Sequence, residues 1–214
     1  MLFYMDAEET WSTTTWMGVP CLKNPLDAWI YQEILYRHRP DVLIECGTNR
    51  GGSALFFAQL CELIGNGHVL SIDINGNPGK PGHARLEYLV MSSTSPECIA
   101  AVRARLKPGD RVMAVLDSDH SKAHVQRELE LYAPLVTPGQ YLVVEDTNLN
   151  GHPVTRSFGP GPMEAVQEFL ATTDEFIVDR EFAERMKVTF SPGGWLRKRV
   201  KTNAGENPNA IGAR

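Results

Sequence analysis

Residues 42–58 read VLIECGTNRGGSALFFA, and this stretch decides the fold. A short apolar run of strand length passes through a glycine-rich turn into a second apolar run of helical length. Gly47 lets the backbone turn sharply after the strand, while Gly51 and Gly52 remove side chains where a ligand would approach the helix N-terminus. We interpret the stretch as the strand–turn–helix unit of a nucleotide-binding α/β fold. Packing of the turn alone is the structural alternative.

Short apolar runs alternate with helix-like segments along the rest of the chain. Five runs predict parallel strands, at residues 42–46, 69–74, 86–91, 112–116 and 141–144. The predicted helices cover residues 25–38, 52–64, 95–106, 121–132 and 163–171. Two more apolar runs, at 176–180 and 187–196, follow without a helix between them and predict an antiparallel pair. The alternation predicts a doubly wound α/β sheet of seven strands with helices on both faces and an antiparallel C-terminal hairpin.

Composition limits the organisation and the partners. The chain has 214 residues, a net charge of −5, 43% hydrophobic and 22% charged residues, as expected of one globular domain. We expect that domain over residues 1–200, with a lid segment at 1–24, and a disordered tail at 201–214. The mild acidity disfavours nucleic acid and anionic membranes, so a small molecule is the expected partner. Without a signal-peptide pattern we expect a cytoplasmic protein, and a homo-oligomer remains open.

Polar residues at the strand ends are candidates for a cofactor site, because ligands of open α/β sheets bind beyond the carboxyl ends of the strands. Asp73 ends the second strand and could accept hydrogen bonds from both ribose hydroxyls of a nucleoside, or simply face water. Ser53 could bind a carboxylate beside free backbone amides, or cap its helix. Ser93 follows the third strand and could meet an adenine edge, or cap the next helix.

The fourth and fifth strands both end in carboxylates. Asp117 follows the fourth strand, and Glu145 and Asp146 follow the fifth. These strand ends meet at one edge of the predicted sheet, so three hard oxygen ligands should gather there. Without a nearby cysteine they favour Mg²⁺, or Mn²⁺ or Ca²⁺, over zinc. Acids held by arginines or backbone amides are the structural alternative.

Longer motifs carry a family resemblance across most of residues 13–199. They are KNPLD at 23–27, GGSA at 51–54, DSDH at 117–120, VEDTN at 144–148, NGHPV at 150–154, GPGP at 159–162 and SPGGWL at 191–196. Together they resemble the cephalosporin hydroxylase family, which also contains rhamnosyl O-methyltransferases. The resemblance implies a Rossmann-like class I methyltransferase fold of the catechol O-methyltransferase-like branch, with S-adenosylmethionine as cofactor.

The resemblance also implies roles for individual residues. Cofactor contacts are expected around Glu45, Gly47, Ser53 and Asp73, and the metal on Asp117, Glu145 and Asp146. The Glu-Asp pair departs from the Asp-Asn of catechol and caffeoyl enzymes. Related enzymes carry lysine three residues after the first metal aspartate, where this chain has His120. His120 is therefore the candidate general base, because imidazole titrates near neutral pH. A structural histidine at the helix start is the alternative.

These features predict an S-adenosylmethionine- and metal-dependent O-methyltransferase acting on a diol, sugar or phenolic small molecule, in secondary metabolism. Loops 13–24 and 147–162 are candidate covers of the site, with Trp16, His152, Arg156 and Phe158 as candidate acceptor contacts. A hydroxylase or hydroxylase component is one alternative, although no flavin or haem motif and no two-histidine iron site is evident. A non-catalytic cofactor-binding subunit of a partner enzyme is the other.

Overall fold

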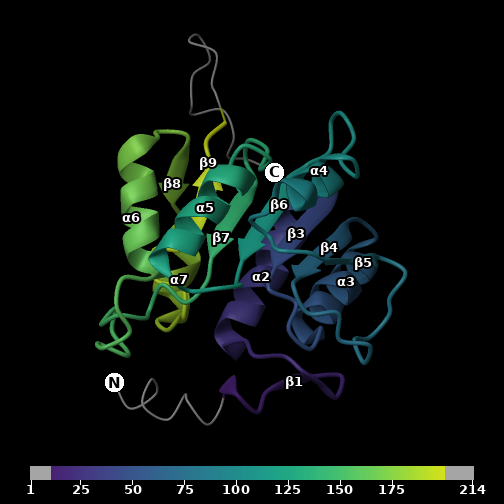
Figure 1. Cartoon of the computed structure of the whole chain (residues 1–214), viewed down its shortest axis with the longest axis horizontal. Coiled ribbons are helices and arrows are strands. Elements are labelled where there is room, and N and C mark those ends of the chain that lie inside the picture. Colours follow the sequence, from purple (N-terminus) through teal and green to yellow (C-terminus); the bar gives the residue numbers. More distant parts are fainter. Residues whose placement is uncertain (1–10, 201–214) are drawn as a thin grey trace.

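The computed structural model describes residues 11–200, and these form a seven-stranded sheet between two layers of helices (Figure 1). The strand order is β5-β4-β3-β6-β7-β9-β8. Five strands run parallel: β3 (Val42–Cys46), β4 (His68–Asp73), β5 (Leu86–Val90), β6 (Val112–Leu116) and β7 (Tyr141–Val144). β8 (Phe176–Val178) and β9 (Trp195–Lys198) close the sheet as an antiparallel pair, with β9 also antiparallel to β7. The predicted fold class is confirmed.

Alternating residues of each strand supply the two cores. In β3, Val42 and Ile44 pack on one face, whereas Leu43 packs on the other. The first face is covered by α4 (Pro96–Arg103), α5 (Lys122–Tyr132) and α6 (Pro162–Thr172). The second is covered by α2 (Pro25–His38), α3 (Gly52–Ile64) and α7 (Glu181–Met186). None of the helices within residues 11–200 is long and apolar enough to cross a membrane.

The predicted C-terminal hairpin needs correction. A six-residue helix, α7, stands between the two strands, and the last strand begins at Trp195 rather than at residue 187. Phe182 draws α7 onto the core, where it is 1% exposed. The backbone then takes positive φ angles at Lys187 and Gly193, which a strand does not tolerate. The antiparallel pairing itself is as predicted.

The bounds of α2, β3, α3, β6 and β7 are as predicted, and the other elements before β8 differ by one to three residues at one or both ends. The N-terminal segment has structure of its own. Within the predicted lid, β1 (Thr15–Trp16) and β2 (Val19–Pro20) form a two-stranded antiparallel sheet. We call residues 14–24 the strap. The first ten residues of the predicted lid and the predicted tail at 201–214 lie outside the described residues.

Candidate functional site

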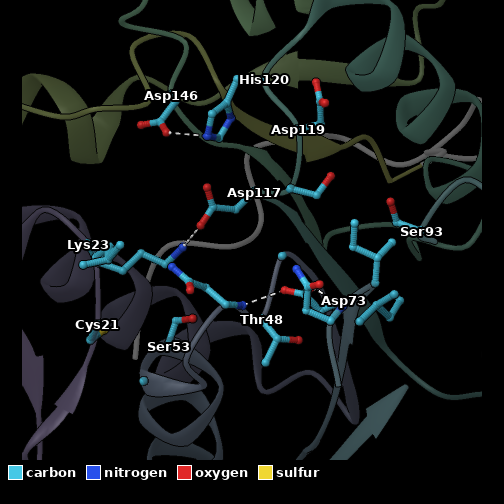
Figure 2. A pocket seen from close by; sticks show the side chains of 18 of the residues that line it. Cys21, Lys23, Thr48, Ser53, Asp73, Ser93, Asp117, Asp119, His120 and Asp146 are labelled. Atoms are coloured by element: carbon cyan, nitrogen blue, oxygen red, sulfur yellow. Dashed lines mark hydrogen bonds and ion pairs between the residues drawn. The ribbon is translucent and has the colours of Figure 1, made fainter. Parts of the chain in front are cut away.

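A cavity of about 710 Å³ opens at the carboxyl ends of β3, β4 and β6, beside the point where the strand order reverses between β3 and β6 (Figure 2). Seven of the predicted site residues line it: Gly47, Ser53, Asp73, Ser93, Asp117, His120 and Asp146. The other two, Glu45 and Glu145, are buried and do not line it. The strap also contributes to the lining through residues 20–23.

The glycines of the turn are required by the chain's own packing. A Cβ atom at Gly47, where φ is +101°, would lie 1.8 Å from the backbone carbonyl oxygen of Asp117. A Cβ at Gly52 would lie 2.1 Å from the carbonyl oxygen of Pro20 in the strap. A Cβ at Gly51 would lie 2.8 Å from the Tyr88 hydroxyl. Close packing against the chain therefore accounts for these glycines, and Gly47 and Gly52 also line the cavity, so the turn stays a candidate ligand contact.

Asp73 lies at the end of β4 and faces the cavity (Figure 2). Its Oδ2 accepts from the backbone N–H of Asn49 at 2.7 Å, and its Oδ1 accepts from that of Asn75 at 2.8 Å. The carboxylate thus fixes the glycine turn to the strand end. Each of its oxygens can accept a second hydrogen bond, so a ribose hydroxyl would still find an acceptor here.

Glu45 and Ser53 form a buried pair under the cavity. Glu45 is fully buried and accepts from the hydroxyl of Ser71 at 2.5 Å, and burial raises its pKa. Ser53 lies beside the same carboxylate in α3, whose N-cap is Gly51, so Ser53 does not cap that helix. Glu45 Oε1 has no hydrogen-bond partner within residues 11–200, which is costly for a buried oxygen. It is the kind of acceptor that a ligand ammonium requires.

Ser93 belongs to a hydroxyl–imidazole group rather than to a helix cap. Its Oγ lies 3.2 Å from Nε2 of His124, which is also 3.0 Å from Oγ of Ser118. A hydrogen bond with Glu128 raises the pKa of His124. Ser95, two residues further on, is the residue that caps α4. Polar groups therefore converge on this end of the cavity, where we expected the adenine edge.

The carboxylates at the other end of the cavity are already paired with basic side chains (Figure 2). Lys23 Nζ lies 2.5 Å from Asp117 Oδ2 and 2.7 Å from Glu145 Oε1. His120 Nε2 lies 3.1 Å from Asp146 Oδ2. Burial raises the pKa of each of the three carboxyls, and repulsion from a neighbouring carboxylate adds to the rise in each case. Burial would lower the pKa of Lys23, but the carboxylates outweigh it and hold that pKa well above its usual value.

Asp117, His120 and Asp146 each offer one ligand atom, and these atoms lie within 4.8 Å of one another. The carboxylates of Asp117 and Asp146 suit Mg²⁺ or Mn²⁺, whereas an imidazole ligand is typical of zinc, copper or iron. Glu145, which we also predicted as a ligand, is paired with Lys23 and accepts from the Tyr31 hydroxyl at Oε1, 2.6 Å away. The carboxylates around Lys23 carry more negative charge than its one positive charge neutralises, so a bound cation would fit beside them.

The sequence did not identify Lys23 as a site residue. It lies 94 residues from Asp117, and only its place in the KNPLD motif could have drawn notice.

Two candidate acceptor contacts, Trp16 and His152, are engaged elsewhere. Trp16 packs edge-on against Phe56 and donates to Gln59 at 2.7 Å.

His152 lies 3.0 Å from Glu164 Oε1, which also accepts from Asn150. These contacts hold the 147–162 loop onto the first turn of α6. Phe158, in the same loop, is 42% exposed but does not line the cavity.

Comparisons with known proteins bear on this site. A family model described as rhamnosyl O-methyltransferase/CmcI matches residues 8–199. A rhamnosyl O-methyltransferase of Mycobacterium leprae (strain TN) is 45% identical over 195 residues, covering 87% of this chain and 83% of the relative. One of Mycobacterium tuberculosis (strain ATCC 25618 / H37Rv) is 45% identical over 197 residues, covering 87% and 78%.

Two solved structures share the fold. An apo structure of CmcI superposes with a TM-score of 0.70 at 19% identity, covering 89% of this chain and 78% of that one. A structure of CmcI described with Mg and SAM gives a TM-score of 0.65 at 19% identity, covering 88% and 78%. At this identity the likeness concerns the fold.

Proposed function

Because the chain belongs to the rhamnosyl O-methyltransferase/CmcI family, we propose that it transfers the methyl group of S-adenosylmethionine to a hydroxyl of a small molecule beside a divalent cation. The chain is accordingly an enzyme of the O-methyltransferase class. One observation carries the proposal: a single cavity joins Asp73, suited to a nucleoside, to the acidic group at Asp117 and Asp146. Cofactor and acceptor would thus meet in one space.

The cofactor end of the cavity fits a nucleoside with a charged amino-acid tail. Asp73 would accept from the ribose hydroxyls, and Ser93 would face the base. The orphaned oxygen of Glu45 supports a place for the ammonium of the amino-acid tail near Ser53 and Gly47. These positions would orient the sulfonium methyl toward the acidic end, and orientation of this kind can supply much of a rate enhancement.

The acidic end fits a cation. Of the three predicted metal ligands, Asp117 and Asp146 line the cavity, with His120 near them, whereas Glu145 does not line it. A bound divalent cation would lower the pKa of a hydroxyl group next to it. His120 is the proposed proton acceptor for that hydroxyl. Its Nε2 lies 3.1 Å from Asp146, so the imidazolium formed by accepting the proton would be stabilised by a neighbouring negative charge.

The acceptor that we propose first is a sugar carrying two adjacent hydroxyls, such as a rhamnosyl group, because the matched relatives are named for that sugar. Other diols and phenols of secondary metabolism come next. The hydroxylase alternative gains no support from the site, since its candidate ligands include one histidine where facial-triad iron sites use two. A non-catalytic cofactor-binding subunit would have no need of the carboxylates of Asp117 and Asp146 in its cavity.

Incubation with radiolabelled S-adenosylmethionine, Mg²⁺ and a panel of rhamnosides, diols and phenols tests the proposal. Label should pass to at least one acceptor and should be lost with excess chelator. The variant Asp117→Asn should bind S-adenosylhomocysteine but transfer no label. Full transfer in excess chelator would show that the carboxylates are structural.

A further inference from the structure

Trp11 is the one tryptophan whose indole has no partner within residues 11–200. The other three tryptophans of the chain each donate their indole N–H to a side chain: Trp16 to Gln59 at 2.7 Å, Trp29 to Glu33 and Trp195 to Thr189, both at 3.2 Å. An indole N–H that is removed from water usually finds an acceptor. Trp11 is half-buried and still has none in the described chain, so its N–H is open to a ligand.

Trp11 lines the cavity that joins the proposed cofactor end to the acidic end. No other tryptophan, tyrosine or phenylalanine among residues 11–200 does so, and the lining leaves out Trp16 and Phe158, two of the expected acceptor contacts. Small-molecule sites usually combine aromatic side chains with a few well-placed polar groups. In the described part of the chain, Trp11 is therefore the aromatic side chain that a ligand in this cavity can meet.

The hydroxyl of Thr14 ties Trp11 to the strap. It lies 2.8 Å from the carbonyl oxygen of Trp11 and 2.5 Å from that of Cys21, and Cys21 N–H donates to the Thr14 carbonyl at 2.9 Å. The backbone of Trp11 therefore lies close to Cys21. Figure 2 shows Cys21 and Lys23 on the side of the cavity away from Asp73. Trp11 thus belongs to the wall that is far from the end proposed for the nucleoside.

The same wall reaches the acidic end, because Lys23 of the strap contacts Asp117 there. The other predicted residues that line this end, His120 and Asp146, are also polar. A pyranose ring carries hydroxyls around its rim but C–H bonds on its faces, so it needs an apolar surface as well as polar groups. The indole of Trp11 supplies both, since its face is apolar and its N–H is a donor.

We propose that Trp11 is a specificity-determining residue that stacks on the pyranose ring of the acceptor and donates its indole N–H to a hydroxyl of that ring. The assignment rests on the proposed function, because it names a contact of the acceptor in that reaction. An open-chain diol offers the same pair of adjacent hydroxyls but has no rigid face of C–H bonds for the indole. Trp11 would therefore set a preference for pyranosides over open-chain diols.

Tryptophan fluorescence tests the contact without turnover. Protein saturated with S-adenosylhomocysteine would be titrated with methyl α-L-rhamnopyranoside, and the emission of wild type should change as the sugar binds. Trp11→Phe should lose most of that change. Trp29→Phe is the matched control and should keep it, because Trp29 is 60% exposed and does not line the cavity.

Steady-state kinetics with S-adenosylmethionine test the preference. Trp11→Leu should raise KM for the rhamnoside about tenfold and leave kcat within about threefold, because the lost contact is made in substrate binding. KM for propane-1,2-diol should stay within about twofold of wild type, as should the affinity for S-adenosylhomocysteine. Trp11→Phe should recover much of the rhamnoside KM, since phenylalanine keeps an aromatic face.

A fluorescence response that survives in Trp11→Phe, or one that is missing in wild type, would overturn the assignment. Equal KM values for the rhamnoside in wild type and Trp11→Leu would overturn it as well. If Trp11→Leu weakens only the binding of S-adenosylhomocysteine, Trp11 contacts the cofactor and the assignment is wrong. A rhamnoside that changes the fluorescence of Trp11 but receives no methyl group would overturn the proposed function and support the contact.

Discussion

Replacing Gly52 by alanine should push the strap away from α3, and so change the lining of the cavity, without unfolding the protein. The new Cβ would lie 2.1 Å from the Pro20 carbonyl oxygen and 2.8 Å from Cys21 Cβ. Since carbon–oxygen contacts are found from about 3.3 Å, the strap must retreat by about 1 Å. Gly52 is the first residue of α3, so alanine would itself stabilise the helix by up to about 1 kcal/mol.

The strap carries Lys23 and lines the cavity, so its retreat should be visible in function before it is visible in stability. A displacement of about 1 Å at a reacting centre can lower the rate about 10²-fold. We expect a loss of that order in methyl transfer and weaker binding of S-adenosylhomocysteine in calorimetry. The midpoint of denaturant unfolding should stay near that of wild type.

The control is Gly82→Ala, where a Cβ atom would meet nothing within 4 Å. Its affinity for S-adenosylhomocysteine and its rate should equal those of wild type. If Gly52→Ala also keeps both, the strap does not shape the cavity and the packing argument is wrong.

Three further predictions concern single side chains. Asp73→Asn should weaken the binding of S-adenosylhomocysteine by about 1.5–3 kcal/mol, the range for hydrogen bonds to charged groups. An unchanged affinity in calorimetry would place the nucleoside elsewhere. His120→Ala should lower the rate about 10²–10⁴-fold for aliphatic hydroxyls and less for phenols, which ionise more easily; an equal, small loss for both acceptors would remove His120 from the proton transfer. Burial raises the pKa of Asp27 to about 7, so the folded protein keeps a proton that the unfolded chain releases near pH 4. The stability that depends on this proton is fully present below pH 4. It declines by about 4 kcal/mol at most as pH rises through 7. Asp27→Asn should remove that decline in the free energy of unfolding measured from pH 4 to 8, and equal pH dependence in both proteins would contradict the buried acid.

Local patterns predicted the parallel part of the sheet well, because β3, β6 and β7 are short, fully buried and mostly apolar runs. The bounds of β3 and α3 agree with the prediction to the residue. The α7 helix escaped notice because six residues show too little periodicity to identify a helix. Its formation depends on Phe182 reaching a core made by distant segments.

The sequence predicted which acidic residues gather at the site, but not which basic side chain each of them contacts. Strand-end rules brought Asp73, Asp117 and Asp146 to one edge, since they depend only on strand direction. Which acid meets which base depends on the strap and on the left-handed backbone at Asp146. Neither is encoded in a local pattern, so the contact between Lys23 and Asp117 emerged only in three dimensions.

The most direct test of the central claim follows the methyl group itself. The protein would be incubated with Mg²⁺, a rhamnoside bearing adjacent hydroxyls, and S-adenosylmethionine carrying a deuterated methyl group, with the product resolved by mass spectrometry and NMR. We predict a deuterated methyl ether on one hydroxyl oxygen, absent with Asp117→Asn. A protein that binds S-adenosylhomocysteine and Mg²⁺ yet labels no rhamnoside, diol or phenol would contradict the account.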